Sequence, residues 1–262
     1  MTDIPKDHPR YESLLAREKV AAGVKMGITS IQGLIAQGRG ESFDYLLGER
    51  STESALYAER AAVAAFLLAK NPVISVNGNV AALTPDKVVA LADITGAKIE
   101  VNLFHRTEAR MHLIIEQLKA NGASEVLGKN PDASLELSHA RRLVESKGIF
   151  TADVVLVPLE DGDRCEKLVE MGKTVITIDL NPLSRTSRIA TISIVDNLTR
   201  ALENMVKFAR EMKHESKDEL VKLITIYDNK KVLSEAISEI QEHLKAIAAE
   251  IEYEKSDTKN GI

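Results

Sequence analysis

The amino-acid sequence predicts an α/β protein with a mostly parallel, doubly wound sheet. Short runs rich in Val and Ile alternate with amphipathic helical segments, which is the pattern of βα units. Three of the runs are almost continuously apolar, as expected for strands covered on both faces. With 262 residues, 44% of them hydrophobic, the chain is long enough for one large domain, or for one domain with an appendage.

Five segments are expected to form the sheet, and a sixth is a weaker candidate. The five are residues 72–78, 97–104, 152–159, 173–179 and 190–196, and the weaker one is 124–128. Between the first two strands, Thr84 is expected as the N-cap of a helix and Pro85 as its first residue. The helix after the second strand is expected to end at Gly122.

Helical segments are also expected outside the sheet, at residues 8–70 and 217–252. We therefore divide the chain into a catalytic domain, 1–216, and a C-terminal helix with a charged tail, 217–262. Apolar residues in the last helix recur at intervals of three and four, as in a coiled coil. This seam consists of Leu233, Ile237, Ile240, Leu244, Ile247 and Ile251. It packs either on the body of the protein or on a second subunit, and the sequence favours neither.

Composition excludes several classes of protein. The net charge of -5 disfavours extended binding to nucleic acid or to an anionic membrane. The N-terminus lacks the pattern of a secretory signal, and no apolar run is long enough to span a bilayer, so we expect a cytoplasmic protein. A single cysteine, Cys165, excludes a disulfide framework.

Polar side chains gather at the carboxyl ends of the expected strands, where open parallel sheets bind ligands. They are Asn77 and Asn79, then Asn102, His105 and Arg106, then Glu160, Asp161, Asp163 and Arg164, and finally the stretch DLNPLSRTS, residues 179–187. Ordinary loop polarity is the alternative explanation. Asn77 and Asn79 would then only form a turn, and Asp161 or Asp163 would cap a helix.

A second group of cations lies near the N-terminus. Arg17, on a helix expected from Tyr11 to Lys25, lies beside the apolar stripe and requires an anion, which is either a ligand or an internal carboxylate of Glu18 or Glu41. Arg39 follows in the glycine-rich stretch 33–41, where we expect a loop that approaches a ligand. This stretch is not a P-loop, because Arg39 and Gly40 replace the required Lys and Ser or Thr.

Several blocks of the sequence closely resemble archaeal phosphopantothenate synthetase, also called 4-phosphopantoate–β-alanine ligase. The blocks are HPRYESLLAREK, GLIAQGRGESFDYLLGE, PVISVNGNVAAL, IEVNLFHRT, VVLVPLEDGDR and IDLNPLSRTS followed by ISIVDNLTRA. The resemblance extends from about residue 5 to about residue 250. One departure is Gln37, where the family is expected to have His.

The resemblance implies a Rossmann-like fold, a homodimer, and the joining of 4-phosphopantoate to β-alanine with ATP and Mg²⁺. An acyl-adenylate would form first, and AMP and pyrophosphate would be released. The implied ATP contacts are Arg17, Arg39, Asp179, Leu180, Asn181, Arg185, Thr186, Asn197 and Leu198. We further assign Arg39, Asn77 and Asp161 to catalysis.

The second substrate is assigned from the same resemblance. Asn77, Asn79 and Arg106 are expected to bind phosphopantoate, and Asp161 or Glu160 to bind the β-alanine ammonium or Mg²⁺. Two alternatives from other classes remain at this point. One is a small-molecule kinase that acts on a pantoate-like substrate, and the other is a nucleotide-sensing or interaction protein.

Overall fold

The fold was analysed in a computed structural model that describes residues 4–159 and 161–257. Its centre is a parallel sheet of five strands in the order β2-β1-β5-β6-β7. The strands are β1 (Pro72–Val76), β2 (Lys98–Val101), β5 (Val154–Pro158), β6 (Thr174–Ile178) and β7 (Ile192–Ile194). The α/β prediction and all five main strands are confirmed. The weaker candidate, 124–128, forms only an isolated bridge between Glu100 and Leu127.

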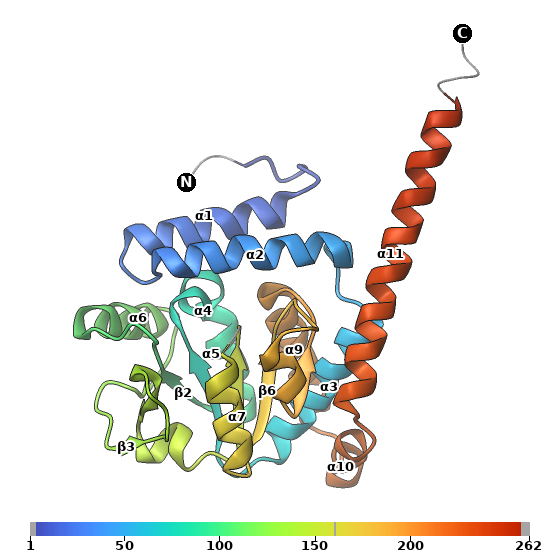
Figure 1. Ribbon diagram of the computed structural model, residues 1–262. Coiled ribbons are helices and arrows are strands. Elements are labelled where there is room, and N and C mark those ends of the chain that lie inside the picture. Colours follow the sequence, from blue (N-terminus) through green and yellow to red (C-terminus); the bar gives the residue numbers. More distant parts are fainter. Residues whose placement is uncertain (1–3, 160, 258–262) are drawn as a thin grey trace.

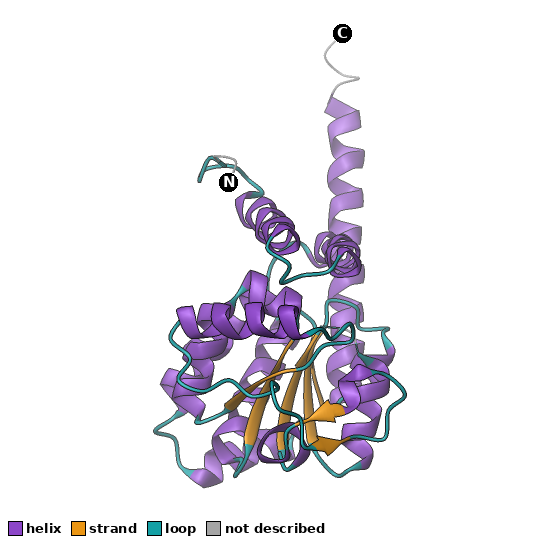
Figure 2. Cartoon of the chain, turned by 90° about the vertical axis from the view of Figure 1, so that its left-hand side faces the viewer, coloured by secondary structure: helices purple, strands orange, loops and turns teal. Residues whose placement is uncertain are grey.

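Helices cover both faces of the sheet (Figure 2). Alternate side chains of one strand therefore enter different cores: Ile74 of β1 joins the larger core and Val73 the smaller one. The larger core contains residues of α3 (Glu53–Leu68), α5 (Pro85–Thr95), α6 (Glu108–Ala120) and α9 (Leu198–Met212). The smaller core contains residues of α7 (Gly162–Glu170), of the short turn η2 (Ser146–Phe150) and of β4 (Leu143–Val144). The strand β4 forms a small antiparallel pair with β3 (Ala133–Ser134). Thr84 precedes α5 as predicted, although its side chain makes no capping hydrogen bond.

Two N-terminal helices, α1 (Tyr11–Lys25) and α2 (Ile31–Leu47), lie across the carboxyl edge of the sheet above the short helix α4 (Gly78–Leu83) (Figure 1). The prediction of a loop at residues 33–41 is wrong, because these residues belong to α2. Ser30 caps the helix by accepting a hydrogen bond from the Gly33 amide at 3.2 Å. Asn79 donates to the Gly33 carbonyl at 2.8 Å, and a Cβ on Gly33 would lie 2.3 Å from its Oδ1. The sequence predicted that Gly33 allows its backbone to approach a ligand closely. In the structure this close approach is to Asn79 of α4.

The C-terminal segment consists of α10 (Lys217–Thr225) and the long helix α11 (Asn229–Asp257) (Figure 1). Leu220 of α10 and Val232 of α11 are buried in the larger core, so the segment beyond the predicted boundary at 216 begins as part of the main body. Leu233 packs beside Leu47 and Val195. The later seam residues Leu244, Ile247 and Ile251 are 44%, 39% and 49% exposed. Thus the protein covers only the first half of the seam. Among the described helices, none combines the length and apolarity needed to cross a membrane.

Candidate active site

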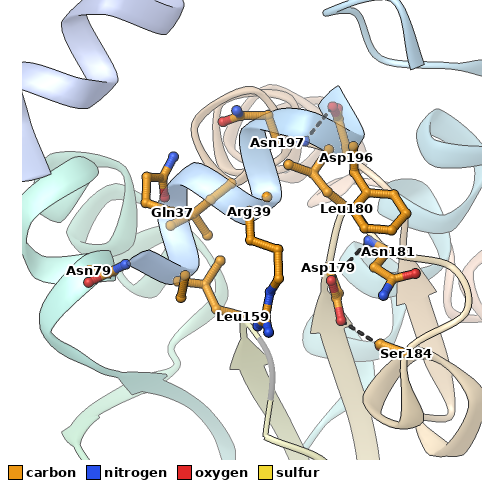
Figure 3. A pocket seen from close by; sticks show the side chains of 14 residues that line it. Gln37, Arg39, Asn79, Leu159, Asp179, Leu180, Asn181, Ser184, Asp196 and Asn197 are labelled. Atoms are coloured by element: carbon orange, nitrogen blue, oxygen red, sulfur yellow. Dashed lines mark hydrogen bonds between the residues drawn. The ribbon is translucent and has the colours of Figure 1, made fainter. Parts of the chain in front are cut away.

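Three adjoining cavities lie at the carboxyl edge of the sheet. The smallest, with a volume of about 80 Å³, lies between α2 and the loops after β6 and β7, and we call it the central pocket. Its lining includes Gln37, Arg39, Asp179, Leu180, Asn181, Asn197 and Leu198 (Figure 3). Six of the nine residues that the sequence assigned to ATP therefore lie together, although they come from three separate parts of the chain.

A larger cavity of about 560 Å³ adjoins the central pocket on the side of α1. This N-terminal pocket includes Arg10, Arg17, Glu41 and Arg200 in its lining, and it shares Gln37 and Asn197 with the central pocket. Arg17, a further predicted ATP residue, therefore lines a cavity next to the central pocket.

A third cavity of about 400 Å³ lies where the strand order reverses, between β1 and β5. Doubly wound sheets bind ligands at this switch point. The lining of this switch-point pocket includes Asn77, Asn79, Arg110, Arg141 and Asp161. It shares Asn79, Arg39, Ala36 and Leu159 with the central pocket. The narrow central pocket is therefore a passage between two wider cavities.

Arg39 lines both the central and the switch-point pockets. Its side chain extends from α2 toward the strand ends, and the guanidinium lies beside Leu159 and faces Asp179 (Figure 3). A guanidinium at this point contacts ligands in either cavity, so the position suits a group that acts where two substrates meet.

The loop after β6 is fixed by its own hydrogen bonds. Asp179 accepts from the Asn181 amide at 3.0 Å and from the Ser184 hydroxyl at 2.5 Å. Asn181 in turn accepts from the Leu183 amide at 3.0 Å. Since these side chains are held by local bonds before any ligand arrives, the loop presents a preorganised polar wall to the central pocket.

The N-terminus of α9 closes the other side of the central pocket. Asn197 is its N-cap and accepts from the Thr199 amide at 3.0 Å, as its predicted position at the helix start requires. Its Nδ2 donates to Asp44 at 3.1 Å. The amide side chain is therefore engaged on both ends. The N-terminus of a helix carries a partial positive charge, which is favourable for an anion.

Arg17 has an internal partner, and it is Glu41. Its Nη2 lies 2.7 Å from Glu41 Oε1. Burial would raise the pKa of Glu41, but hydrogen bonds from Arg17, Ser13 and Tyr45 lower it to about 2. The sequence left Glu18, Glu41 and a ligand as alternatives. In the structure the ion pair with Glu41 is formed at the wall of the N-terminal pocket.

Three predicted site residues line none of these three cavities. Arg185 is exposed and pairs with Asp163 and Glu166 of α7. Thr186 is buried and accepts a hydrogen bond from the Asp161 amide at 3.0 Å. Arg106 donates to the carbonyls of Gly128 and Lys129 at 2.6 and 3.3 Å. Their assignment to ligands stays a prediction.

Asp161 lies in a buried ion-pair group at the base of the switch-point pocket. Its Oδ2 contacts Arg141 and also Arg164, whose side chain is fully buried. Burial alone would raise the pKa of Asp161, but the charges of Arg164 and Arg141 together lower it. A carboxylate held by two guanidiniums is a weak ligand for another cation. Glu160, the other candidate for the ammonium or Mg²⁺, is outside the described residues.

Sequence reasoning missed several lining residues. Asp196, which closes the central pocket, ends the predicted strand at 190–196, so the rule about carboxyl ends pointed to it. Arg110 and Arg141 line the switch-point pocket from α6 and from the short turn η1 (Ala140–Arg142). Neither follows a strand of the main sheet, and no local pattern in the sequence indicated them.

A buried acidic group lies behind the central pocket. Arg200 contacts both Asp196 and Asp44 at 2.6 Å. Glu59, on α3, is fully buried beside this group, where burial and the charge of Asp196 raise its pKa to about 9. Three buried carboxyl groups and one guanidinium therefore share a site, and Glu59 is protonated at neutral pH.

We expect Glu59→Gln to remove a pH dependence of stability. Because the folded protein keeps the Glu59 proton up to about pH 9 and the unfolded chain loses it near pH 4.5, this group lowers the free energy of unfolding as pH rises between those values. The slope approaches about 1.4 kcal/mol per pH unit. Urea denaturation from pH 5 to 9 checks this, with Glu53→Gln, an exposed residue in the first turn of the same helix, as the control. Parallel curves for wild type and Glu59→Gln would contradict it.

Comparisons with known proteins identify the family of this chain. The family model described as phosphopantothenate/pantothenate synthetase matches residues 54–243. A protein of Methanosarcina mazei named 4-phosphopantoate–β-alanine ligase is 88% identical over 97% of this chain and 100% of its own length. Proteins with the same name from Thermococcus kodakarensis and Methanospirillum hungatei are 56% and 49% identical over 95% and 92% of this chain, and 97% and 98% of their own lengths. The chain belongs to the phosphopantothenate/pantothenate synthetase family.

Proposed function

We propose that this chain is a cytoplasmic ligase that joins 4-phosphopantoate to β-alanine at the expense of ATP. The carboxylate of phosphopantoate attacks the α-phosphorus of ATP, pyrophosphate leaves, and the amine of β-alanine displaces AMP from the acyl-adenylate. The product is 4-phosphopantothenate, an intermediate on the route to coenzyme A. The curated relatives carry the name of this activity.

The observation that carries the proposal is the junction of two cavities at Arg39, each with polar side chains at the strand ends in its lining. We assign ATP to the central and N-terminal pockets, beside Asp179, Asn181 and the N-terminus of α9. Phosphopantoate is assigned to the switch-point pocket, beside Asn77 and Asn79. The carboxylate and the α-phosphate would then meet in the narrow passage that Arg39 lines.

Such a reaction needs no nucleophilic side chain. The substrate carboxylate and the β-alanine amine are the attacking groups, so the protein contributes by orienting the reactants and stabilising the charge that develops on phosphate oxygens. A guanidinium suits that charge, because its fixed fork of donors matches phosphate oxygens. Arg39 is accordingly assigned to the α-phosphate, and Asn77 to the reacting carboxylate.

Mg²⁺ is assigned as the companion of ATP. Within residues 4–159 and 161–257, no three His, Cys, Asp or Glu side chains are grouped to hold a metal ion. Mg²⁺ that arrives with a nucleotide takes most of its ligands from phosphate oxygens and water, so one carboxylate at this edge, such as Asp179, is sufficient. The bound ion would neutralise part of the charge on the triphosphate.

The test is to incubate the protein with ATP, Mg²⁺, 4-phosphopantoate and β-alanine, omit each in turn, and identify the nucleotide product. AMP that requires all four components supports the proposal. A kinase, which the curated relatives do not favour, would form ADP from a pantoate-like substrate without β-alanine. Binding of ATP without turnover would indicate a sensing protein.

We also propose that the protein forms a homodimer through the exposed half of the α11 seam. The three exposed residues Leu244, Ile247 and Ile251 continue the apolar face that the protein buries with Leu233, and a second copy of the helix presents a matching face. Such a contact between two copies needs no other partner.

Truncation after His243 is expected to weaken this association without unfolding the protein. His243 packs against Gly48, so this boundary keeps the packed half of the helix and removes the exposed half. Light scattering should give twice the chain mass of 28.7 kDa for wild type and the single mass for the truncated form. Lys245→Glu, on an exposed position of the same helix, is the control. An unchanged mass after truncation would refute the role of the seam.

A further inference from the structure

The switch-point pocket has a cationic wall that the resemblance to known ligases did not assign. It consists of Arg110 on α6 and Arg141 on η1. Arg110 is fixed by two backbone carbonyls: its Nε donates to Ile28 at 2.9 Å and its Nη1 to His105 at 3.1 Å. A Cβ on Gly78 would lie 2.5 Å from its Nη2, so the guanidinium rests against the backbone there. Arg110 is thus held in place by groups that carry no charge.

The charges of this wall are not balanced by the described residues. No described carboxylate forms an ion pair with Arg110, whose pKa is lowered by burial and by the charge of Arg141. Arg141 pairs with Asp161, but the fully buried Arg164 uses the same carboxylate. Arg141 and Arg164 therefore share one carboxylate, and Arg110, at the wall of the cavity, has no ion-pair partner among the described residues.

Two guanidiniums that repel each other in a partly buried site are stabilised when an anion binds between them. A phosphate dianion is well suited, because it carries two charges and several acceptor oxygens, and an arginine fork binds such oxygens in pairs. A carboxylate would supply one charge. The chemistry of the wall therefore favours a phosphate monoester.

Two sources of phosphate exist in the proposed reaction: the ester of the acid substrate and the triphosphate of ATP. Arg110 and Arg141 line the switch-point pocket and neither the central nor the N-terminal pocket, whereas Arg39 and Asn79 line the passage. An acid with its carboxylate in the passage would place a phosphate at its other end against the wall. We propose that Arg110 and Arg141 bind the phosphate ester of the acid substrate and select it over the unphosphorylated acid. This inference rests on the proposed function.

The test crosses two acids with two variants. The kcat/KM for AMP formation is measured with 4-phosphopantoate and with pantoate, in wild type, Arg110→Ala and Arg142→Ala. Arg142 is an exposed neighbour in the same turn as Arg141 and lines none of the three cavities, so it controls for the lost charge. Arg110→Ala should raise the KM for 4-phosphopantoate about 10- to 100-fold, as expected for charge-assisted hydrogen bonds. Its kcat/KM with pantoate and its KM for ATP should stay within about threefold of wild type.

Two outcomes would overturn the inference. Equal losses with both acids would show that Arg110 supports the fold or the chemistry and does not read the phosphate. A raised KM for ATP alone would assign the wall to the triphosphate. If wild type forms no AMP, the proposed function fails, and calorimetry with 4-phosphopantoate and a non-hydrolysable ATP analogue still decides the site: wild type should bind the ester, and Arg110→Ala should bind it at least about tenfold more weakly.

Discussion

Arg39→Ala is expected to lower kcat/KM for ligation by about a thousandfold, the largest effect on activity that we expect from one substitution. Removal of one preorganised donor to a developing negative charge lowers the rate by about 100- to 1000-fold, and Arg39 also lines both of the cavities that we assign to the substrates. The side chain is exposed on α2, so the melting temperature should change by less than about 3 °C. Initial rates of AMP formation and thermal melting followed by circular dichroism measure the two effects.

Two further variants sharpen this test. Arg39→Lys keeps the charge but loses the planar fork, and we expect it to recover only part of the activity. Arg50→Ala removes an exposed arginine just beyond the same helix and away from the three cavities, and it should be indistinguishable from wild type. Near-normal activity in Arg39→Ala would remove Arg39 from the site. A collapsed melting curve would show that Arg39 supports the fold.

The sheet was predictable because its physical signal is local. Each main strand is a short run rich in Val and Ile and bounded by polar residues, and its short length and β-branched content distinguish it from a buried helix. The weaker candidate at 124–128 lacks such a run, and it forms a single bridge. The glycines of α2 led to the wrong prediction of a loop, because there the local signal disagrees with the folded structure. Local propensity disfavours a helix there, but the cap at Ser30 and packing of Gly33 on Asn79 offset it.

From local pattern, the lining of the candidate site was predictable mainly where it follows the strand ends. Asp179 and Asn181 come directly after β6, and the geometry of a parallel sheet places them at the edge that binds ligands. Arg110 and Arg141 reach the same edge from a helix flank and from a short turn, which no periodicity reveals. Arg185 follows a strand end, and its sequence neighbours suggest a phosphate ligand. In the folded protein, however, tertiary packing places Asp163 and Glu166 beside it as ion-pair partners.

Asp161→Asn is expected to lower the free energy of unfolding by about 3 to 5 kcal/mol, the largest effect on stability. The substitution removes the carboxylate from both Arg141 and the fully buried Arg164, and a buried charge left without its partner is strongly destabilising. Arg164 keeps hydrogen bonds to Ser75 and Asn102 at 2.8 and 2.6 Å, but these are neutral acceptors. Urea denaturation at pH 7 measures the loss.

The matched control is Asp163→Asn, two residues away. Asp163 pairs with Arg185 on the surface, where both side chains are more than half exposed, so this substitution should change the free energy of unfolding by less than about 1 kcal/mol. If the two variants were equally stable, the buried pairing of Asp161 would have no energetic weight. A partial rescue of Asp161→Ala by Arg164→Met would support the pairing, because an apolar side chain removes the stranded charge.

The same group makes a prediction for acid. The pKa of Asp161 is lowered in the folded protein, against an unfolded value near 3.8. Its contribution to stability is therefore complete above that unfolded value and is lost as pH falls through the lower, folded one. Wild type should lose stability on acidification below about pH 4 in part through this group, whereas Asp161→Asn carries no such proton and should start lower and fall less steeply. An equal fall in both proteins would mean that the two arginines obtain their balancing charge elsewhere, and Asp161 would then be available to the substrate ammonium.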